Sequence, residues 1–472
     1  MLRKIKIFNT LTGKKDLIKP KQAGKINLFV CGPTVYDYSH IGHARNYVVF
    51  DAFVKYLKTS GYSVFYLQNI TDIDDKIIAR AREKGVSPKD LALAFEQEYL
   101  QTMKALGVNS ITKYARATAH IKEIISQTQR LLQKGFAYEL VDDGIYYDIS
   151  KFKNYGKLSG RTALQAEDAV SRIDYSKDKR NRGDFCLWKF NQDSSEPSWP
   201  SPFGNGRPGW HIEDTAIAEK YFGAQYDVHG AARDLIFPHH EAEIAQMEAL
   251  SGKKPMVKHW MHVGFLTVKQ QKMSKSLENF ITIRDILSRI SPQCLRFLIL
   301  KNLWSSPVDY SDSALMETKA ALEKIEEFLR KITSVKISKI NNKQLIQNKK
   351  LIEKLKKDFY KELDDDFNTP KAFAVIFEFI KRANQLLDEE KVTKKEAEDV
   401  YKFFEGFDKI FGVIDFKRVK FTIPLQIRQL AKKREEYRKN KEWQKSDLSR
   451  MEIEKQGYIL EDGPNGPIIK LV

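Results

Sequence analysis

The stretch from residue 25 to residue 70 limits the fold of this chain more than any other part of the sequence. Residues 25–31 (KINLFVC) predict a buried strand, and residues 63–70 (SVFYLQNI) predict a second one. Between them, apolar residues at helical spacing predict a helix that begins near Ile41 and ends at Gly61. A strand, a helix and a strand joined by a right-handed crossover start a doubly wound parallel sheet. We therefore predict an α/β fold of the Rossmann-like type.

The same alternation of helices and strands returns near residue 211. The elements predicted there are a helix near 211–222, a strand at 226–230, a helix at 239–251 and a strand at 261–268. Between the two halves, a turn signal at Asp142, Asp143 and Gly144 predicts a hairpin over 136–149, and residues 150–209 form an irregular stretch. We predict that residues 1–110 and 200–290 form one catalytic domain and that residues 111–199 are a connective insertion.

The last third of the chain has a helical pattern. We predict an α-helical bundle over 291–415, in which Asn368 or Thr369 caps a helix with Pro370 in its first turn. A strongly basic helix is predicted over 425–445, followed by a hairpin-like tail. Residues 420–472 are therefore predicted as a small C-terminal α+β region.

The first predicted helix begins with His40-Ile41-Gly42-His43, after a turn at Gly32 and Pro33. At such a helix start, free backbone N–H groups and the positive end of the helix dipole attract an anion. Gly42 lets a nucleotide lie close to the backbone, and both histidines can donate hydrogen bonds to phosphate. A match of four residues is weak when it stands alone.

A second basic element, Lys272-Met273-Ser274-Lys275-Ser276, follows the last predicted strand of the same domain. Its two lysines can reach the β- and γ-phosphates of a nucleotide and stabilise charge as pyrophosphate leaves. Taken singly, the element favours an exposed basic loop. The two elements in this order, each after a parallel strand, are far more specific.

HIGH followed much later by KMSKS resembles the class I aminoacyl-tRNA synthetases. Further stretches narrow the resemblance to the cysteinyl-tRNA synthetase family over nearly the whole chain: FVCGPTVYD, QNITDIDDKI, GRPGWHIED, FPHHEAEIAQ and DDFNTP. The resemblance implies that the chain activates cysteine with Mg-ATP and transfers it to the 2′-hydroxyl of the terminal adenosine of tRNA(Cys). The residues that it assigns to charge stabilisation are His40, His43, Lys272 and Lys275.

The resemblance also implies one zinc ion per chain, held by Cys31, Asp214, His239 and Glu243. His239 and Glu243 are four residues apart at a helix start, so they share a face and can both reach a metal. Zinc coordinates a thiolate, which would distinguish cysteine from serine without an editing domain. The alternative interpretation is a buried strand cysteine at Cys31 and a helix-capping role for His239 or His240.

Position 214 departs from the commonest family pattern, which has cysteine there. Aspartate and thiolate carry the same charge, but a hard oxygen replaces a soft sulfur. Zinc still accepts a carboxylate ligand. We expect the change to lower the affinity for zinc.

Further residues are assigned to the substrates by resemblance. Gly32, Thr71 and Trp210 would line the cysteine pocket with His211 close by, Gly42 and Lys275 would hold ATP, and Asp227, His229 and Gly230 would contact the adenosine. The usual family segment has a second glycine where this chain has Ala231. We interpret the acidic run Asp72, Asp74 and Asp75 as a helix cap or a partner of lysines rather than as a metal cluster.

The charge of the chain is compatible with an RNA partner. Lys and Arg outnumber Asp and Glu by 80 to 62, a formal charge of +18, which favours a polyanion because bound cations release counterions from phosphates. A basic proteome or a solvated lysine-rich surface would explain the charge equally well. Near the C-terminus, the residues suited to backbone contact and anticodon reading are Arg428, Lys432, Arg434, Arg438 and Trp443.

Cysteine usage and hydropathy predict a cytoplasmic protein. The three cysteines, Cys31, Cys186 and Cys294, are too few and too far apart for a disulfide framework. No apolar run approaches the roughly 20 residues that span a bilayer, and the start of the chain has no signal-peptide stretch. The resemblance implies a monomer.

Two other functions stay open at this point. One is a small-molecule ligase, similar to mycothiol cysteine ligase, that joins activated cysteine to an amine. The helical and basic C-terminal third argues against it, because a small acceptor needs no such surface. The other is a non-catalytic RNA-binding paralogue, which the intact HIGH and KMSKS motifs oppose.

Overall fold

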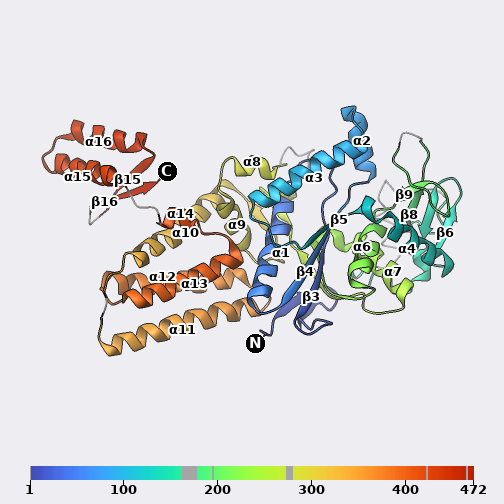
Figure 1. Cartoon of the computed structure of the whole chain (residues 1–472), viewed down its shortest axis with the longest axis horizontal. Coiled ribbons are helices and arrows are strands. Elements are labelled where there is room, and N and C mark those ends of the chain that lie inside the picture. The colour runs from blue at the N-terminus through green and yellow to red at the C-terminus, as the bar shows by residue number, and fades with distance from the viewer. Residues whose placement is uncertain are drawn as a thin grey trace.

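The computed structural model describes residues 2–161, 178–193, 196–272, 280–337, 339–420, 424–463 and 466–471. Figure 1 shows a parallel sheet with its covering helices near the centre, the insertion at the right, the helical bundle at the left and a small lobe beyond the bundle. The termini lie at different places, with the N-terminus below the sheet and the C-terminus in the small lobe.

The catalytic domain is built on five parallel strands. Their order across the sheet is β11 (Val257–Val263), β10 (Tyr226–Ala232), β3 (Lys25–Val30), β4 (Ser63–Ile70) and β5 (Lys113–Arg116). The chain runs outward from β3 to β5 and then returns on the other side of β3, so the strand order reverses between β3 and β10. Ligands of doubly wound sheets bind beside the carboxyl ends of the strands at this reversal. The predicted Rossmann-like fold is confirmed.

The side chains of β3 alternate between two hydrophobic cores. Ile26, Leu28 and Val30 face the core that α1 shares with the helical bundle, whereas Phe29 faces the core of the insertion. Both faces of the sheet are therefore covered, which explains why residues 28–31 are all apolar. The helices outside the insertion are α1 (Ile41–Thr59), α2 (Asp75–Lys84), α3 (Pro88–Ala105), α6 (Ile212–Phe222) and α7 (His239–Ser251), with the 3₁₀ turn η4 (Arg233–Ile236). Residues 111–199 contribute α4 (Ile121–Gln133) and the 3₁₀ turns η1 (Ala117–His120) and η2 (Ile149–Lys151).

The insertion carries an antiparallel sheet of β6 (Ala137–Leu140), β7 (Gly144–Tyr147), β8 (Phe185–Phe190) and β9 (Gly206–Pro208). β6 and β7 form the predicted hairpin, with Asp142 in a left-handed conformation at its turn. The stretch 150–209 is less irregular than predicted, because it supplies β8 and β9 to this sheet. β5, in turn, lies inside the range predicted as insertion but belongs to the parallel sheet.

The strand predicted at 261–268 is two strands. β11 ends at Val263, and β12 (Leu266–Val268) belongs to a separate sheet with β13 (Gln271–Lys272) and β14 (Val308–Tyr310). Gly264 lies at the break, where an added Cβ would be 2.3 Å from the carbonyl oxygen of Ser306. Only glycine allows the two backbones to approach this closely. An N-terminal hairpin of β1 (Lys6–Asn9) and β2 (Lys14–Leu17) completes the domain.

The helical bundle follows α8 (Ile283–Leu287) and α9 (Pro292–Leu300). It comprises α10 (Asp312–Thr333), α11 (Asn342–Asp364), α12 (Thr369–Asp388), α13 (Lys394–Phe411) and α14 (Phe416–Lys420). Asn368 caps α12 as predicted, and its side chain accepts the N–H of Lys371 at 3.2 Å. Arg296 of α9 joins the bundle to α1, since it donates to Asp51 Oδ2 at 2.8 Å and to the Phe411 carbonyl at 2.7 Å.

The C-terminal lobe consists of α15 (Leu425–Lys439), α16 (Trp443–Lys455), β15 (Tyr458–Gly463) and β16 (Gly466–Leu471). It has a small core of its own, which includes Ile427, Ile453 and Tyr458. The single basic helix predicted over 425–445 is wrong, because Lys441 takes a left-handed conformation (φ 59°) and separates α15 from α16. The predicted hairpin at the end of the chain is present as β15 and β16.

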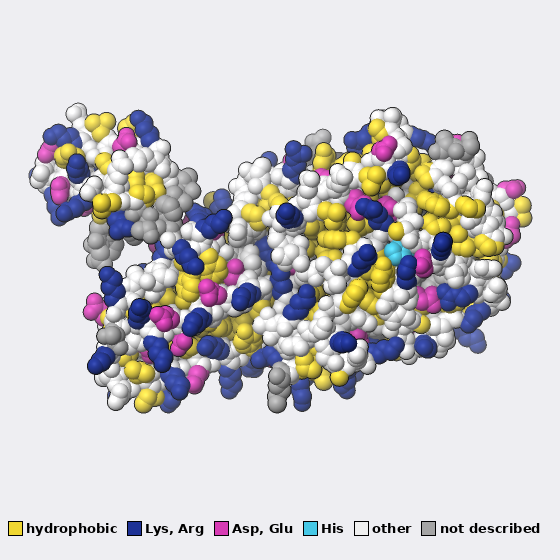
Figure 2. Space-filling model, viewed as in Figure 1, with side chains coloured by type: hydrophobic (Ala, Val, Ile, Leu, Met, Phe, Trp, Pro, Cys, Tyr) yellow, Lys and Arg dark blue, Asp and Glu magenta, His cyan; other side chains and the backbone are white. Residues whose placement is uncertain are grey.

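Lysine and arginine side chains are spread over the face of the molecule seen in Figure 2, from the C-terminal lobe across the bundle to the catalytic domain. Among the residues that the structure describes, no helix is both long and apolar enough to cross a membrane.

Candidate active site and metal centre

A cavity of about 450 Å³ opens at the carboxyl ends of β3 and β4. It therefore lies at the reversal of strand order, where a doubly wound sheet is expected to bind its ligand. Segments that are far apart in the sequence line it, among them the end of β3, the start of α1, the end of β4, and the starts of α6 and α7. The residues predicted to act in catalysis, substrate binding or metal binding that line it are Cys31, Gly32, His40, Gly42, His43, Thr71, Trp210, Asp214 and His239.

His40 and His43 cap the start of α1 reciprocally. Nδ1 of His40 accepts the N–H of Gly42 at 3.1 Å, and Nδ1 of His43 accepts the N–H of His40 at 3.3 Å. Burial lowers the pKa of His40 to about 4 and also lowers that of His43, so both rings are neutral near pH 7. Because Nδ1 is an acceptor in each ring, the single proton lies on Nε2. Each histidine thus offers one neutral N–H donor at the N-terminus of α1, the positive end of the helix dipole.

The KMSKS element lies outside the described residues, except for the backbone of Lys272 in β13. Phe280, the first described residue after it, lines the cavity, and its ring meets His40 edge-on at 5.2 Å between centroids. The carbonyl of Ile281 accepts the N–H of Ile41 at 3.1 Å. The segment that follows the element is therefore attached to the HIGH turn, while the roles of Lys272 and Lys275 stay predictions.

The predicted cysteine pocket is tightly built. The N–H of Gly32 donates to Asn69 Oδ1 at 2.5 Å, and a Cβ on Gly32 would be 1.7 Å from the Asn69 carbonyl oxygen. Thr71 Oγ1 donates to the buried Glu213 at 2.7 Å. Trp210 is 38% exposed and stacks on His239 with 4.4 Å between ring centroids. No residue larger than glycine fits at position 32, and Trp210 is the exposed edge of this pocket.

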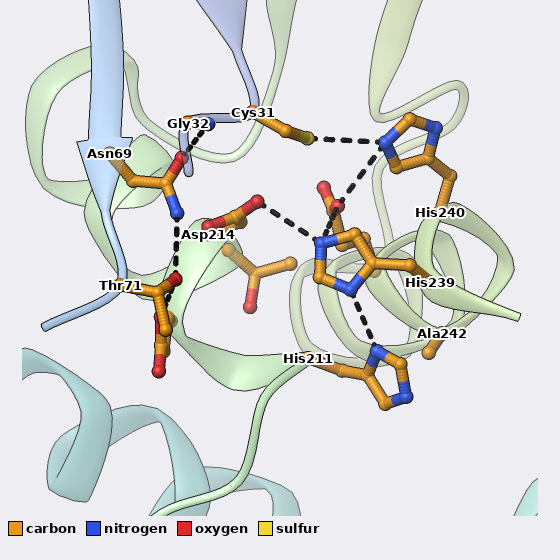
Figure 3. Close-up of polar contacts among 12 residues, drawn as sticks. Cys31, Gly32, Asn69, Thr71, His211, Asp214, His239, His240 and Ala242 are labelled. Atoms are coloured by element: carbon orange, nitrogen blue, oxygen red, sulfur yellow. Dashed lines mark hydrogen bonds and ion pairs between the residues drawn. The ribbon is translucent and has the colours of Figure 1, made fainter. Parts of the chain in front are cut away.

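His211 lies behind the pocket rather than in its wall. It is buried, and its Nδ1 lies 2.8 Å from Nδ1 of His239 (Figure 3). Its position orients the His239 ring so that Nε2 faces Asp214 at 3.1 Å. A partner on the second ring nitrogen is the usual arrangement of a metal-binding histidine.

The four residues predicted to bind zinc do lie together, and we call them the outer donor set: Cys31, Asp214, His239 and Glu243. One ligand atom from each lies within 4.8 Å of all the others, and all four side chains are buried. Burial and the neighbouring Asp214 raise the pKa of the Glu243 carboxyl, and burial with both carboxyls raises the pKa of the Cys31 thiol.

Glu243 makes this group a candidate metal site. Neither of its carboxylate oxygens has a hydrogen-bond partner among the described residues, although Nε2 of His239 lies 3.1 Å from Oε1. Burying a carboxylate without a partner costs at least roughly 1–3 kcal/mol of folding free energy unless a positive charge compensates it. The donor set of one sulfur, one nitrogen and two carboxylates fits a divalent ion such as zinc.

The residues predicted to contact the adenosine, Asp227, His229 and Gly230, do not line this cavity, and their contact with adenosine stays a prediction. Asp227 accepts backbone N–H groups of Lys21 at 2.5 Å and Asn27 at 3.0 Å, and Gly230 packs against the Phe50 ring. His229 is buried beside Cys31. None of the three lines the cavity, because β10 continues to Ala232 and only its last residue reaches the rim. In their place the rim contains Ala232, Asp234 and Leu235.

The sequence analysis missed several residues that support the site. Asn69 holds the Gly32 turn, Glu213 accepts from Thr71, and His240 lies beside Cys31. Asn69 stands at the end of a predicted strand beside Thr71, and the pair His239-His240 was visible as a dipeptide, so both had a local signal. By contrast, Asp74 has the capping role that was predicted for the acidic run, since it accepts the N–H of Lys76 at 2.8 Å.

Comparison with known proteins places the chain in a family. The model of the tRNA synthetases class I (C) catalytic domain matches residues 17–320, and that of the DALR domain matches residues 358–415. The cysteine–tRNA ligase of Thermococcus gammatolerans is 43% identical over 478 residues, covering 99% of both chains. That of Thermoplasma volcanium is 44% identical over 461 residues, covering 97% of both.

The chain belongs to the cysteine–tRNA ligase family of class I synthetases.

Solved structures agree with this fold. A Mycobacterium tuberculosis methionyl-tRNA synthetase in complex with methionyl-adenylate superposes with a TM-score of 0.60 at 14% identity, covering 82% of this chain and 89% of that one. The LeuRS of Agrobacterium radiobacter K84, in a ternary complex, gives a TM-score of 0.62 at 11% identity, covering 84% and 85%. At such low identity these structures bear on the fold of this synthetase and not on its substrate.

Proposed function

We propose that this synthetase activates cysteine with ATP and loads the product onto tRNA(Cys). The observation that carries the proposal is one cavity that joins the HIGH histidines to a buried group containing a thiol, an imidazole and two carboxylates. The first part suits a nucleotide phosphate, and the second suits an ion that can select a thiol. Both parts are needed for cysteine activation, and neither alone would serve.

We further propose that zinc is the ion and that the outer donor set holds it. When bound there, zinc would favour the thiolate form of cysteine over the alcohol of serine, which does not ionise comparably. The neighbouring side chains then orient the amino acid. Trp210 closes the exposed edge of the pocket, while Gly32 and Thr71 form its floor.

In the first step, the cysteine carboxylate attacks the α-phosphate of Mg-ATP, giving cysteinyl adenylate and pyrophosphate. His40 and His43 donate their Nε2–H groups to the phosphates as charge develops, because both rings are neutral and their other nitrogens are occupied. Lys272 and Lys275 are proposed to stabilise the departing pyrophosphate. We propose that the adenosine lies along Gly42 and the rim at Ala232 and Asp234, because these residues line the cavity and Asp227 does not.

In the second step, the terminal adenosine's 2′-hydroxyl takes the cysteinyl group, and no covalent enzyme intermediate forms. The C-terminal lobe is proposed to contact the anticodon. Trp443 is 58% exposed and free to stack on a base, whereas Arg434 is buried and donates to Asp462 at 2.8 Å. Arg434 therefore stabilises the lobe, and its predicted RNA contact passes to exposed neighbours. The enzyme is proposed to act as a cytoplasmic monomer.

The test is incubation with labelled cysteine, ATP and total tRNA. Label that precipitates with RNA and is released by mild base supports the proposal. Adenylate formation without label on RNA would instead favour a ligase with a small-molecule acceptor, and no adenylate would leave an RNA-binding protein. Zinc is tested separately by elemental analysis of protein purified without chelators, where sub-stoichiometric zinc with full cysteine selectivity would contradict its role.

A further inference from the structure

A second cavity, of about 400 Å³, lies beside the active-site cavity at the same edge of the parallel sheet, and we call it the side cavity. Thr71 lines the active-site cavity, whereas the next two residues of the chain, Asp72 and Ile73, line the side cavity. Arg116, the last residue of β5, lines the side cavity as well. Since consecutive Cα atoms are about 3.8 Å apart, one short segment at the end of β4 separates the two cavities.

One wall of the side cavity is an aromatic ring that the surrounding structure holds in place. Trp199, in the loop before β9, is half-buried and exchanges backbone hydrogen bonds with Gly206 at 2.7 and 3.0 Å. Its ring packs against Ile73. The same loop is tied to α2, because Glu196 pairs with Arg82 at 3.1 Å. A fixed, partly exposed ring offers a flat face on which a planar ligand can stack.

The charged groups of the side cavity favour a neutral planar ligand over a phosphate. Among the described residues that line it, the cations Lys89 and Arg116 balance the carboxylates of Asp72 and Glu96. A cavity with no net charge attracts a phosphate weakly. Its apolar wall, to which Leu93 of α3 contributes, suits the face of a nucleobase.

Hydrogen-bonding groups in the side cavity can distinguish one base from another. Nε of Arg116 donates to both oxygens of Glu96, at 2.9 and 2.8 Å, so its two Nη groups keep their N–H donors. Carboxylate oxygens of Asp72 and Glu96 have lone pairs left to accept an exocyclic amine, and the Nη groups can donate to a ring carbonyl. Cytosine and guanine carry both an amine and a carbonyl on one edge, whereas adenine lacks the carbonyl and uracil lacks the amine. Two cytosines precede the terminal adenosine of every tRNA.

We propose that the side cavity binds one of the two cytosine bases at the unpaired 3′ end of tRNA, stacked on Trp199. The inference rests on the proposed function, because it takes tRNA(Cys) as the acceptor. The terminal adenosine must enter the active-site cavity for its 2′-hydroxyl to react, so the nucleotides before it lie next to that cavity. Lys76, exposed at the active-site cavity, and Lys89, exposed at the side cavity, can contact their phosphates.

The direct test uses the unaltered protein with altered RNA. Transcripts of tRNA(Cys) are made in which one or the other terminal cytosine is replaced by an abasic nucleotide. At one of the two positions, the loss of the base should raise the KM for tRNA about tenfold, as the loss of one base stack does. An unchanged KM at both positions overturns the proposal.

A variant of the stacking ring gives the second test. Trp199→Ala should raise the KM for intact tRNA about tenfold and show no further loss with the sensitive abasic transcript, because the stack is already absent. Trp199→Phe keeps a flat ring and should stay close to the parent. Cysteine-dependent pyrophosphate exchange should be unchanged in both variants. A ring that only supports the loop would give additive losses, and additive losses overturn the proposal.

A filled cavity gives a third test, which leaves Trp199 and its backbone hydrogen bonds in place. Leu93 is 36% exposed on α3, so Leu93→Trp should fill the side cavity without unfolding the protein. Its KM for intact tRNA should rise, and its dependence on the cytosine base should vanish. The matched control is Leu345→Trp, at a 41% exposed leucine of α11 in the bundle. A Leu93→Trp variant that keeps the parent's KM and base dependence overturns the proposal.

Pyrophosphate exchange and charging of intact tRNA(Cys), measured on the parent protein, separate this inference from the proposed function. Exchange and charging without dependence on either cytosine base would refute the role of the side cavity and leave the function intact. Adenylate formation without charging of tRNA would refute the function, and this inference with it.

Discussion

The wall of the cavity around Glu243 and the C-terminal lobe use polar side chains in opposite ways. In the wall they are buried and held by one another: His239 is 2% exposed and contacts Asp214, Glu243 and His211. In the lobe, which has only a small hydrophobic core, Trp443 is 58% exposed. A thiol must be selected by donors fixed in a dry place, whereas an RNA must reach its contacts from solvent. The contrast fits our proposal that the two regions serve different steps of the reaction.

This contrast has a measurable consequence, because the first step needs no RNA. Changes in the wall should abolish cysteine activation and hence transfer as well. Changes in the lobe should leave activation untouched and affect transfer alone. Variants that fail to separate in this way would break the contrast.

The largest effect is expected for Glu243→Gln. The amide cannot compensate a cation, so the variant should lose zinc and reduce cysteine-dependent pyrophosphate exchange by at least about 100-fold, or roughly 2.7 kcal/mol. Zinc at about 100 times its Kd should stabilise the parent protein by roughly 2.7 kcal/mol and the variant by nothing measurable. Elemental analysis, exchange rates and thermal unfolding with and without chelator check these outcomes.

Glu248→Gln is the matched control for that change. Glu248 is buried on the same helix, α7, but its carboxylate is paired with Lys157 at 2.6 Å. Its loss should lower stability without removing zinc. Full zinc content in Glu243→Gln, or equal loss in both variants, would contradict the role given to Glu243.

The next effect is expected on the other side of the cavity. Lys275→Ala removes a cation proposed to meet the departing pyrophosphate, so cysteine-dependent pyrophosphate exchange should fall at least about tenfold, or about 1.4 kcal/mol. Zinc content should not change, because Lys275 does not belong to the outer donor set. Lys253→Ala, at an exposed lysine just past α7, is the control. An undiminished rate in Lys275→Ala would refute the proposed role.

The sequence predicts some parts of the fold and of the candidate site better than others. The strand–turn–helix around Gly32 and His40 is local, so period and turn chemistry were sufficient to predict it. The outer donor set came from a family resemblance, and its members lie together as that resemblance implied. His229 and His240 were not predicted as neighbours of Cys31, because they meet it only through the pairing of β3 with β10 and the packing of α7.

The errors have physical causes of the same kind. β5 has four residues without clear alternation, and only its pairing with β4 makes it a strand. The contact of Asp227, His229 and Gly230 with the adenosine stays a prediction, and of strand β10 only Ala232 lines the cavity. In the lobe, charge and helix propensity continue through Lys441, and its left-handed backbone is set by the packing of α15 against α16.

A smaller and more selective effect is expected in the lobe. Base stacking on an aromatic side chain is worth about 1–3 kcal/mol, so Trp443→Ala should raise the KM for tRNA about tenfold. Pyrophosphate exchange and thermal stability should not change, because the side chain is exposed. Leu425→Ala, at a 71% exposed residue of α15, is the control for loss of apolar surface. A fall in exchange rate in Trp443→Ala would break the contrast between lobe and wall.

The smallest expected effect is an absence of titration at His40. Its pKa is lowered to about 4 by burial, whereas in the unfolded chain the imidazole takes up its proton near pH 6.5. The folded protein therefore binds fewer protons than the unfolded chain between these values, and stability from this group, fully present above pH 6.5, is lost as the pH falls toward 4. The measurement is NMR of histidine-labelled protein, with the His40 ring signal assigned by its loss in His40→Asn. Between pH 5.5 and 8 the chemical shift of this signal should change by less than about one tenth of a full titration. A titration midpoint near pH 6.5 would mean that the His40 ring is solvated and can become cationic at the phosphate site. The wall would then resemble the lobe in using exposed charge.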